Sequence, residues 1–128
     1  MLLARLREPS GAELAVANLH ASTGGHADEV LRAARIADDW SEGAPLLFGG
    51  DLNLRPEQAT AAFAELESRH GLSGSTAPHA IDHLLARGMR PVAAAAPLPA
   101  QRREVPAPGG RAIRLSDHDI VTASFEVE

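Results

Sequence analysis

The alternation of apolar and polar positions along the chain predicts strands and helices in a regular order. Apolar runs over residues 2–7 and 13–20 flank the turn-forming sequence Glu8-Pro9-Ser10-Gly11, which predicts a hairpin. Apolar residues then recur at steps of three and four over residues 27–40, a spacing typical of an amphipathic helix. The chain therefore begins with two paired strands and a helix.

A third strand and a second helix follow. The apolar run 45–48 is closed by a Gly-Gly pair and predicts a buried strand. Apolar positions over residues 59–66 predict a second helix, with Pro56 in its first turn and Gly71 just beyond its end. The order strand, helix, strand, helix is typical of layered α/β packing.

The remaining pattern predicts three more strands and one irregular segment. Strands are expected over residues 80–85, 90–96 and 120–127, with Gly88 turning between the first two. Residues 97–112 hold four prolines and two glycines, which predicts no regular structure there. A connection of this length inside a compact domain is usually functional or disordered.

Composition limits the class of protein. The 128 residues suffice for one domain, and 25 alanines with few aromatic residues predict a thin core. The absence of Cys excludes disulfides, thiolate metal sites and cysteine nucleophiles. No apolar run reaches membrane-spanning length and no signal-peptide pattern follows Met1, so we expect a soluble protein, cytoplasmic by default.

The charge is unevenly distributed. A net charge of −5 argues against a protein that coats nucleic acid. All 12 basic residues are Arg, and six of them fall within residues 87–114, where Glu104 is the single acid. Biased composition and a phosphate-facing loop are both open interpretations of this segment.

Polar side chains collect where the predicted strands end. His20 ends the second strand, Asp51 and Asn53 follow the buried strand, and Asp117-His118 precede the last strand. Loops at strand ends bring distant side chains into one site in layered folds. Turn residues, a helix cap and a histidine at the edge of the core are the structural alternatives.

A purely structural role is harder to assign to Asp82. It lies beside Ile81 and close to Leu84 and Leu85, where a carboxylate is costly to bury without a partner. The natural partner is a histidine, because a carboxylate orients an imidazole and raises its proton affinity.

Together these residues predict a hydrolytic site for a phosphoester. Asp51 and Asp117 offer hard oxygen ligands suited to Mg²⁺ or Mn²⁺. Asn53 can donate a hydrogen bond to a non-bridging phosphate oxygen, and His20 can do the same or protonate a leaving group.

Four motifs, in this order, resemble the C-terminal motifs of the endonuclease/exonuclease/phosphatase superfamily. They are Asn18-Leu19-His20, Gly50-Asp51-Leu52-Asn53, Ile81-Asp82-His83 and Ser116-Asp117-His118-Asp119. This superfamily includes pancreatic-type deoxyribonucleases, abasic-site endonucleases, bacterial sphingomyelinases and inositol-phosphate phosphatases. The resemblance extends from Leu14 to Val127. It implies the C-terminal half of a DNase I-like four-layer α/β/β/α sandwich, with two helices and a mostly antiparallel or mixed sheet.

The resemblance also implies a role for each matched residue. Asp51 would orient or deprotonate the attacking water, and Asn53 would bind the scissile phosphate. Asp117 would join Asp51 at a site for Mg²⁺ or Mn²⁺. His118 would contact the phosphate, with Asp82 as its orienting carboxylate.

The resemblance implies a catalytic role for some histidines and not for others. His20 stands where the deoxyribonuclease and sphingomyelinase branches carry a catalytic histidine, assigned to leaving-group protonation or phosphate binding, whereas abasic-site endonucleases carry a Tyr there. The other four match no catalytic position, and we expect packing or surface roles for His26, His70, His79 and His83.

The matched motifs belong to half of a typical member. Members are about twice as long, and the early Asn and the metal-binding Glu of their N-terminal half have no match here. We therefore expect one partial domain over residues 1–128. Half a sandwich leaves a sheet face uncovered, so a second copy or a complementing N-terminal half is the expected protein partner.

Two classes of function follow from the sequence. The first is a divalent-metal-dependent phosphodiesterase, nuclease or phosphatase, with nucleic acid, phospholipid and inositol phosphate all open as substrates and residues 97–114 as the candidate selectivity loop. The second is a catalytically incomplete fragment or partner-binding unit without activity alone. A pure nucleic-acid-binding module is disfavoured by the net charge and the lack of aromatic platforms.

Overall fold

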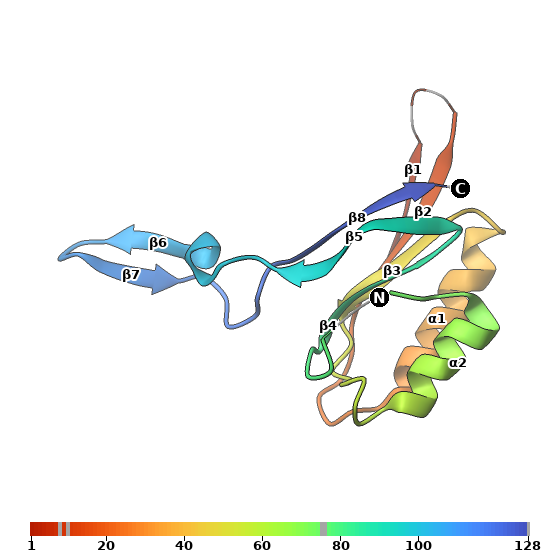
Figure 1. Ribbon diagram of the computed structural model, residues 1–128, viewed down its shortest axis with the longest axis horizontal. Coiled ribbons are helices and arrows are strands. Elements are labelled where there is room, and N and C mark those ends of the chain that lie inside the picture. The colour runs from red at the N-terminus through yellow and green to blue at the C-terminus, as the bar shows by residue number, and fades with distance from the viewer. Residues whose placement is uncertain (8, 10, 75–76, 128) are drawn as a thin grey trace.

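The computed structural model describes residues 1–7, 9, 11–74 and 77–127. It contains a four-stranded sheet with two helices beside it, and a separate two-stranded ladder that leads into a protruding hairpin (Figure 1). The predicted N-terminal hairpin is confirmed, because β1 (Leu2–Arg7) pairs antiparallel with β2 (Glu13–His20). Glu8 and Ser10 of the predicted turn lie outside the described residues.

The main sheet is mixed, as predicted. β3 (Leu46–Asp51) pairs parallel with β2 and antiparallel with β4 (Asp82–Arg87), giving the order β1-β2-β3-β4. β3 does not stop before the Gly-Gly pair but continues through it. A Cβ on Gly49 or Gly50 would clash with the backbone of β4 or β2, so these glycines permit close strand pairing. Asp51 is therefore the last residue of the strand.

Both helices cover one face of this sheet (Figure 1). α1 (Ala27–Ser41) buries positions three and four residues apart, as its periodicity predicted. α2 (Thr60–His70) ends at Gly71, whose φ of 64° closes the helix in the left-handed conformation. Pro56 is not in the first turn of α2, contrary to the prediction. Residues 58 and 59 both donate backbone hydrogen bonds to the carbonyl of Arg55 and form a separate turn before the helix.

The hydrophobic core is confined to the first two thirds of the chain. Among the described residues, every buried hydrophobic side chain lies between Ala15 and Ala86. Phe48, Leu46 and Leu66 are the large side chains at its centre, and alanines supply much of the rest. The helices and β2 to β4 therefore form the packed part of the molecule.

The C-terminal strands lie outside this core. β5 (Met89–Pro97) pairs antiparallel with β8 (Val121–Val127), and most of their side chains are exposed. Gly88, with φ of 67°, turns the chain between β4 and β5, as predicted. Within the described residues, no helix is long and apolar enough to cross a membrane.

The segment predicted to be irregular is instead folded. A short 3-10 helix η1 (Ala100–Arg103) leads into a hairpin of β6 (Glu104–Ala107) and β7 (Arg111–Arg114). Figure 1 shows these elements, which we call the arm (residues 100–114), projecting away from the helices. The prediction was wrong because Pro106 is tolerated in a two-stranded ladder and Gly109-Gly110, both at positive φ, form its turn.

Candidate active site

The register of three strands brings the first site residues together. His20 at the end of β2 lies opposite Asp51 at the end of β3, and Asp51 lies opposite Asp82 at the start of β4. Parallel pairing of β2 with β3 places both of their carboxyl ends at one edge of the sheet. Three residues that are far apart in the sequence thus become neighbours.

Asp51 lies between two imidazoles. Its Oδ2 atom is 3.7 Å from Nε2 of His20 and 3.6 Å from Nε2 of His118. The side chain of Asp51 is 14% exposed, whereas that of His20 is 79% exposed. A shielded carboxylate therefore faces one largely exposed and one partly shielded histidine.

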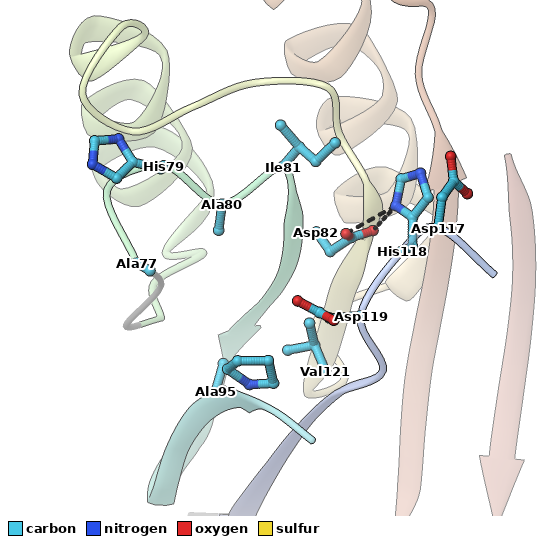
Figure 2. Close-up of a pocket in the computed structure, with 11 residues that line it drawn as sticks. Ala77, His79, Ala80, Ile81, Asp82, Ala95, Asp117, His118, Asp119 and Val121 are labelled. Carbon is cyan, nitrogen blue, oxygen red and sulfur yellow. Dashed lines mark hydrogen bonds and ion pairs between the residues drawn. The ribbon is translucent and has the colours of Figure 1, made fainter. Parts of the chain in front are cut away.

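Asp82 and His118 form the ion pair that the sequence suggested for Asp82. Nδ1 of His118 donates to the Asp82 carboxylate, with oxygens at 3.0 and 3.1 Å (Figure 2). The hydrogen bond and charge of Asp82, with a further contribution from Asp51, raise the pKa of His118 above its ordinary value. The backbone of His118 also donates to Oγ of Ser116 at 3.0 Å.

Asn53 holds the loop after β3. Its φ of 48° is in the left-handed region, and its backbone N–H donates to Oδ1 of Asp51 at 3.0 Å. Nδ2 donates to the carbonyl of Ala21 at 2.8 Å, so one amide hydrogen is engaged and the other has no acceptor among the described residues. Asn53 therefore orients the carboxylate of Asp51 and ties the ends of β2 and β3 together.

Asp117 lies on the rim of the site. It is exposed, and it lines a pocket of about 490 Å³ together with Asp82, His118 and Asp119 (Figure 2). His20, Asp51 and Asn53 lie beside this pocket rather than in its lining. The structure thus gathers the predicted residues on one edge of the molecule.

One group of side chains suits a divalent cation. Ligand atoms of Asp51, Asp82 and His118 all lie within 4.8 Å of one another. Two carboxylates fit Mg²⁺ or Mn²⁺, which take few protein ligands and retain water. Asp82 is already engaged by His118, so Asp51 is the carboxylate available to the ion. The predicted ligand Asp117 is not a member of this group.

Two of the remaining histidines have structural surroundings, whereas His79 lines the pocket. His83 is buried, its Nε2 donates to the carbonyl of Leu54 at 2.8 Å, and its ring centroid lies 5.0 Å from that of Phe63. Burial lowers the pKa of His83, which favours the neutral ring. His70 pairs with Asp38 in the helical layer.

Sequence reasoning missed one contact of the site. Arg103, in the 3-10 helix, lies 2.8 Å from Asp119 and donates to the backbone carbonyl of Asp117 at 3.0 Å. It is one of six similar arginines within residues 87–114, and nothing in the sequence distinguishes it from the others.

Comparisons with known proteins agree with this architecture. No family model and no curated protein matches the sequence. An endonuclease/exonuclease/phosphatase family protein from Bacteroides thetaiotaomicron superposes with a TM-score of 0.64 over 94% of this chain and 51% of its own, at 15% identity. A humanized D. rerio TDP2 carrying 14 mutations superposes with a TM-score of 0.57 over 98% of this chain and 57% of its own, at 19% identity.

These matches bear on the fold. The chain spans about half the length of the two solved structures. The match covers almost all of this chain, which is a mixed α and β structure with two helices, as the four motifs indicated. The chain therefore has the DNase I-like fold over the roughly half of each structure that it matches.

Proposed function

We propose that this chain carries the site of a divalent-metal-dependent phosphoester hydrolase, in which water attacks phosphorus. The observation that carries the proposal is the position of Asp51, within 3.7 Å of both His20 and His118, while Asp82 holds the far side of the His118 ring. A base, an acid and an oriented imidazole within reach of one point are the groups that such a reaction needs.

Each side chain has a chemical role in this proposal. Asp51 accepts a proton from the attacking water or orients it. His118, whose raised pKa favours the imidazolium, stabilises charge on the phosphate oxygens in the transition state. His20, which is exposed, protonates the leaving group or binds the phosphate. Asn53 donates its remaining amide hydrogen to a phosphate oxygen.

A divalent ion fits beside Asp51. When bound, Mg²⁺ or Mn²⁺ would polarise a phosphoryl oxygen and acidify water. Asp51 would hold the ion, and Asp117, on the rim of the site, is the further ligand that the motif resemblance implies. The substrate is a phosphoester of nucleic acid, phospholipid or inositol phosphate.

Hydrolysis of bis-(para-nitrophenyl) phosphate by the full chain with Mg²⁺ or Mn²⁺ tests this proposal. Asp51→Ala, His118→Ala and His20→Ala should each reduce the rate by roughly 100-fold or more, because each removes a group of the reacting centre. His26→Ala is the matched control, since His26 is exposed and has no place in the site. Activity that survives all three substitutions or excess chelator would overturn the mechanism.

The second candidate is a partial domain that is inactive without a partner. It is favoured by the length of the chain, about half that of the solved structures, and by the exposed β5–β8 ladder. A complementing N-terminal half or a second copy would then complete the sandwich. Isothermal titration separates the two candidates, because a chain that binds no Mg²⁺ or Mn²⁺ at millimolar concentration is not a competent enzyme alone.

A further inference from the structure

Arg103 connects the arm to the segment that carries His118. We propose that Arg103 is a positioning residue, whose guanidinium fixes residues 115–120 (the His118 segment) so that the His118 ring faces Asp51. This inference rests on the proposed function for its catalytic consequence, while its structural part can be tested without any activity.

Three contacts tie Arg103 to alternate residues of the His118 segment. The backbone N–H of Leu115 donates to the carbonyl of Arg103 at 2.8 Å. Nη1 donates to the backbone carbonyl of Asp117 at 3.0 Å, and Nη2 lies 2.8 Å from Oδ1 of Asp119. The last two contacts hold the residues on either side of His118.

The burial of Arg103 makes these contacts strong. Its side chain is 12% exposed, although it lies at the base of an arm whose other arginines are exposed. Its Nε atom is also buried, without a hydrogen-bond partner among the described residues. Because a desolvated guanidinium is costly unless it is paired, and its planar fork can bond two oxygens at once, the two contacts should persist together.

The His118 segment has few other restraints. The hydrogen bond from His118 to Ser116 is internal to the segment, and Leu98 donates to the carbonyl of Ile120 at its end. Asp82 restrains only the ring of His118. Arg103 therefore anchors the residues on both sides of His118.

Arg103 acts indirectly in this arrangement. It does not line the pocket that contains Asp82 and His118, and its donors point to protein oxygens. Its loss should therefore misplace His118 rather than remove a substrate contact. Misplacing a catalytic group by about 1 Å can reduce a rate by roughly 100-fold.

Hydrogen exchange of the full chain tests the structural part. In Arg103→Ala, the hydrogen-bonded amides of the His118 segment, those of Leu115 and His118, should exchange at least about tenfold faster, while those of α1 and β3 keep their protection. Arg103→Lys should recover part of the protection, because an ammonium can pair with Asp119 but cannot span both oxygens. Arg35→Ala is the matched control, since it removes an exposed Arg–Asp pair elsewhere.

Unchanged exchange in the His118 segment of Arg103→Ala would overturn the proposal. If Arg103→Ala also loses the protection of α1 and β3, this variant has unfolded and Arg103→Lys provides the test instead. The proposal then requires that α1 and β3 stay protected in Arg103→Lys while the His118 segment exchanges faster than in the unsubstituted chain.

Kinetics test the catalytic part. With bis-(para-nitrophenyl) phosphate, Arg103→Ala should lower kcat by about tenfold or more and leave KM almost unchanged. In a His118→Ala background the same change should have little further effect, because Arg103 acts through His118. Full additivity of the two substitutions, or a loss confined to KM, would contradict this role. A chain without any measurable hydrolysis would instead contradict the proposed function, and the exchange result would still stand.

Discussion

At the scale of single residues, Asp82 is the main cause of the raised pKa of His118. Its carboxylate accepts from Nδ1 of His118, and the pair is reinforced by the nearby charge of Asp51. The folded-state pKa of His118 lies above its unfolded value. The stabilisation from this pair is therefore fully present below the unfolded pKa and is lost as the pH rises through the folded one.

Asp82→Asn should lower the pKa of His118 towards its ordinary value, because the hydrogen bond to a carboxylate and its charge are both removed. NMR titration of the His118 ring in metal-free protein measures this change. Glu57→Gln is the control, since it removes a carboxylate that pairs with a different histidine, His79. A His118 titration that is the same in Asp82→Asn and the unsubstituted chain would show that Asp82 does not govern it.

Gly50 is a second residue on which the site depends. Its φ is 116°, and a Cβ there would clash with the carbonyl of Leu19 on β2. Gly50→Ala should destabilise the fold by about 3 kcal/mol or more, because backbone strain and steric overlap add.

Gly43→Ala is the control for Gly50→Ala, because Gly43 also has positive φ but has open space around its Cβ position. It should cost about 1 kcal/mol, the effect of backbone conformation alone. Urea denaturation measures both variants. If the two variants lost equal stability, the close approach of β2 and β3 would not be the reason for a glycine at position 50.

At the scale of elements, one polar network joins both helices to β4. Asp38 of α1 accepts from Arg87 of β4 and pairs with His70 of α2 at 2.8 Å. Arg87 also donates to Ser41 and to the carbonyl of Ala44. Burial opposes ionisation of Asp38, but the hydrogen bonds from His70 and Arg87 outweigh it and lower its pKa.

Arg87→Ala should destabilise the chain by about 2 kcal/mol, since Asp38 and Ser41 lose a partner in a partly buried place. The contribution of Asp38 is present above its unfolded pKa and is lost as the pH falls through its lowered folded pKa. Arg87→Ala should therefore unfold at a less acidic pH, as measured by circular dichroism. The control Arg35→Ala removes an exposed ion pair with Asp39. It should change neither the free energy of unfolding nor the pH of unfolding appreciably.

The arm is the element to which we assign substrate selectivity. Replacing residues 104–114 by a short Gly linker leaves Arg103 and the His118 segment in the chain. This variant should change the relative rates on nucleic acid, sphingomyelin and inositol phosphate more than it changes the Mg²⁺ concentration needed for activity. The ratio of the rates is compared with that of the intact chain. A changed metal requirement with unchanged ratios would assign the arm to the metal site instead.

Local sequence patterns predicted the helices and strands better than they predicted contacts between residues. The periodicity of α1 and the alternation in β2 reflect burial of one face, which each segment encodes by itself. The arm was not predictable, because proline and glycine signal a break without showing whether a hairpin turn follows. The motif residues could be selected from the sequence. Which of them lie next to each other depends on strand register, and the sequence does not display that register.

At the scale of the whole molecule, the chain has two parts with unequal packing. The helices and β2 to β4 share the core, whereas β5, the arm and β8 contribute no buried hydrophobic side chain among the described residues. Apolar side chains remain exposed on the second part, including Val92, Leu115 and Val127. The complementing half or second copy proposed above would cover these side chains.

The division between these two parts passes through the candidate active site. Asp51 and Asp82 belong to the packed part, whereas His118 arrives on the segment before β8. Weakly packed regions open at lower free energy than the core does. On warming, hydrolysis should therefore disappear several degrees before the helical signal melts, and a partner that covers β5 and β8 should close this gap. The temperature interval between inactivation and unfolding thus measures how firmly His118 is held against its two carboxylates.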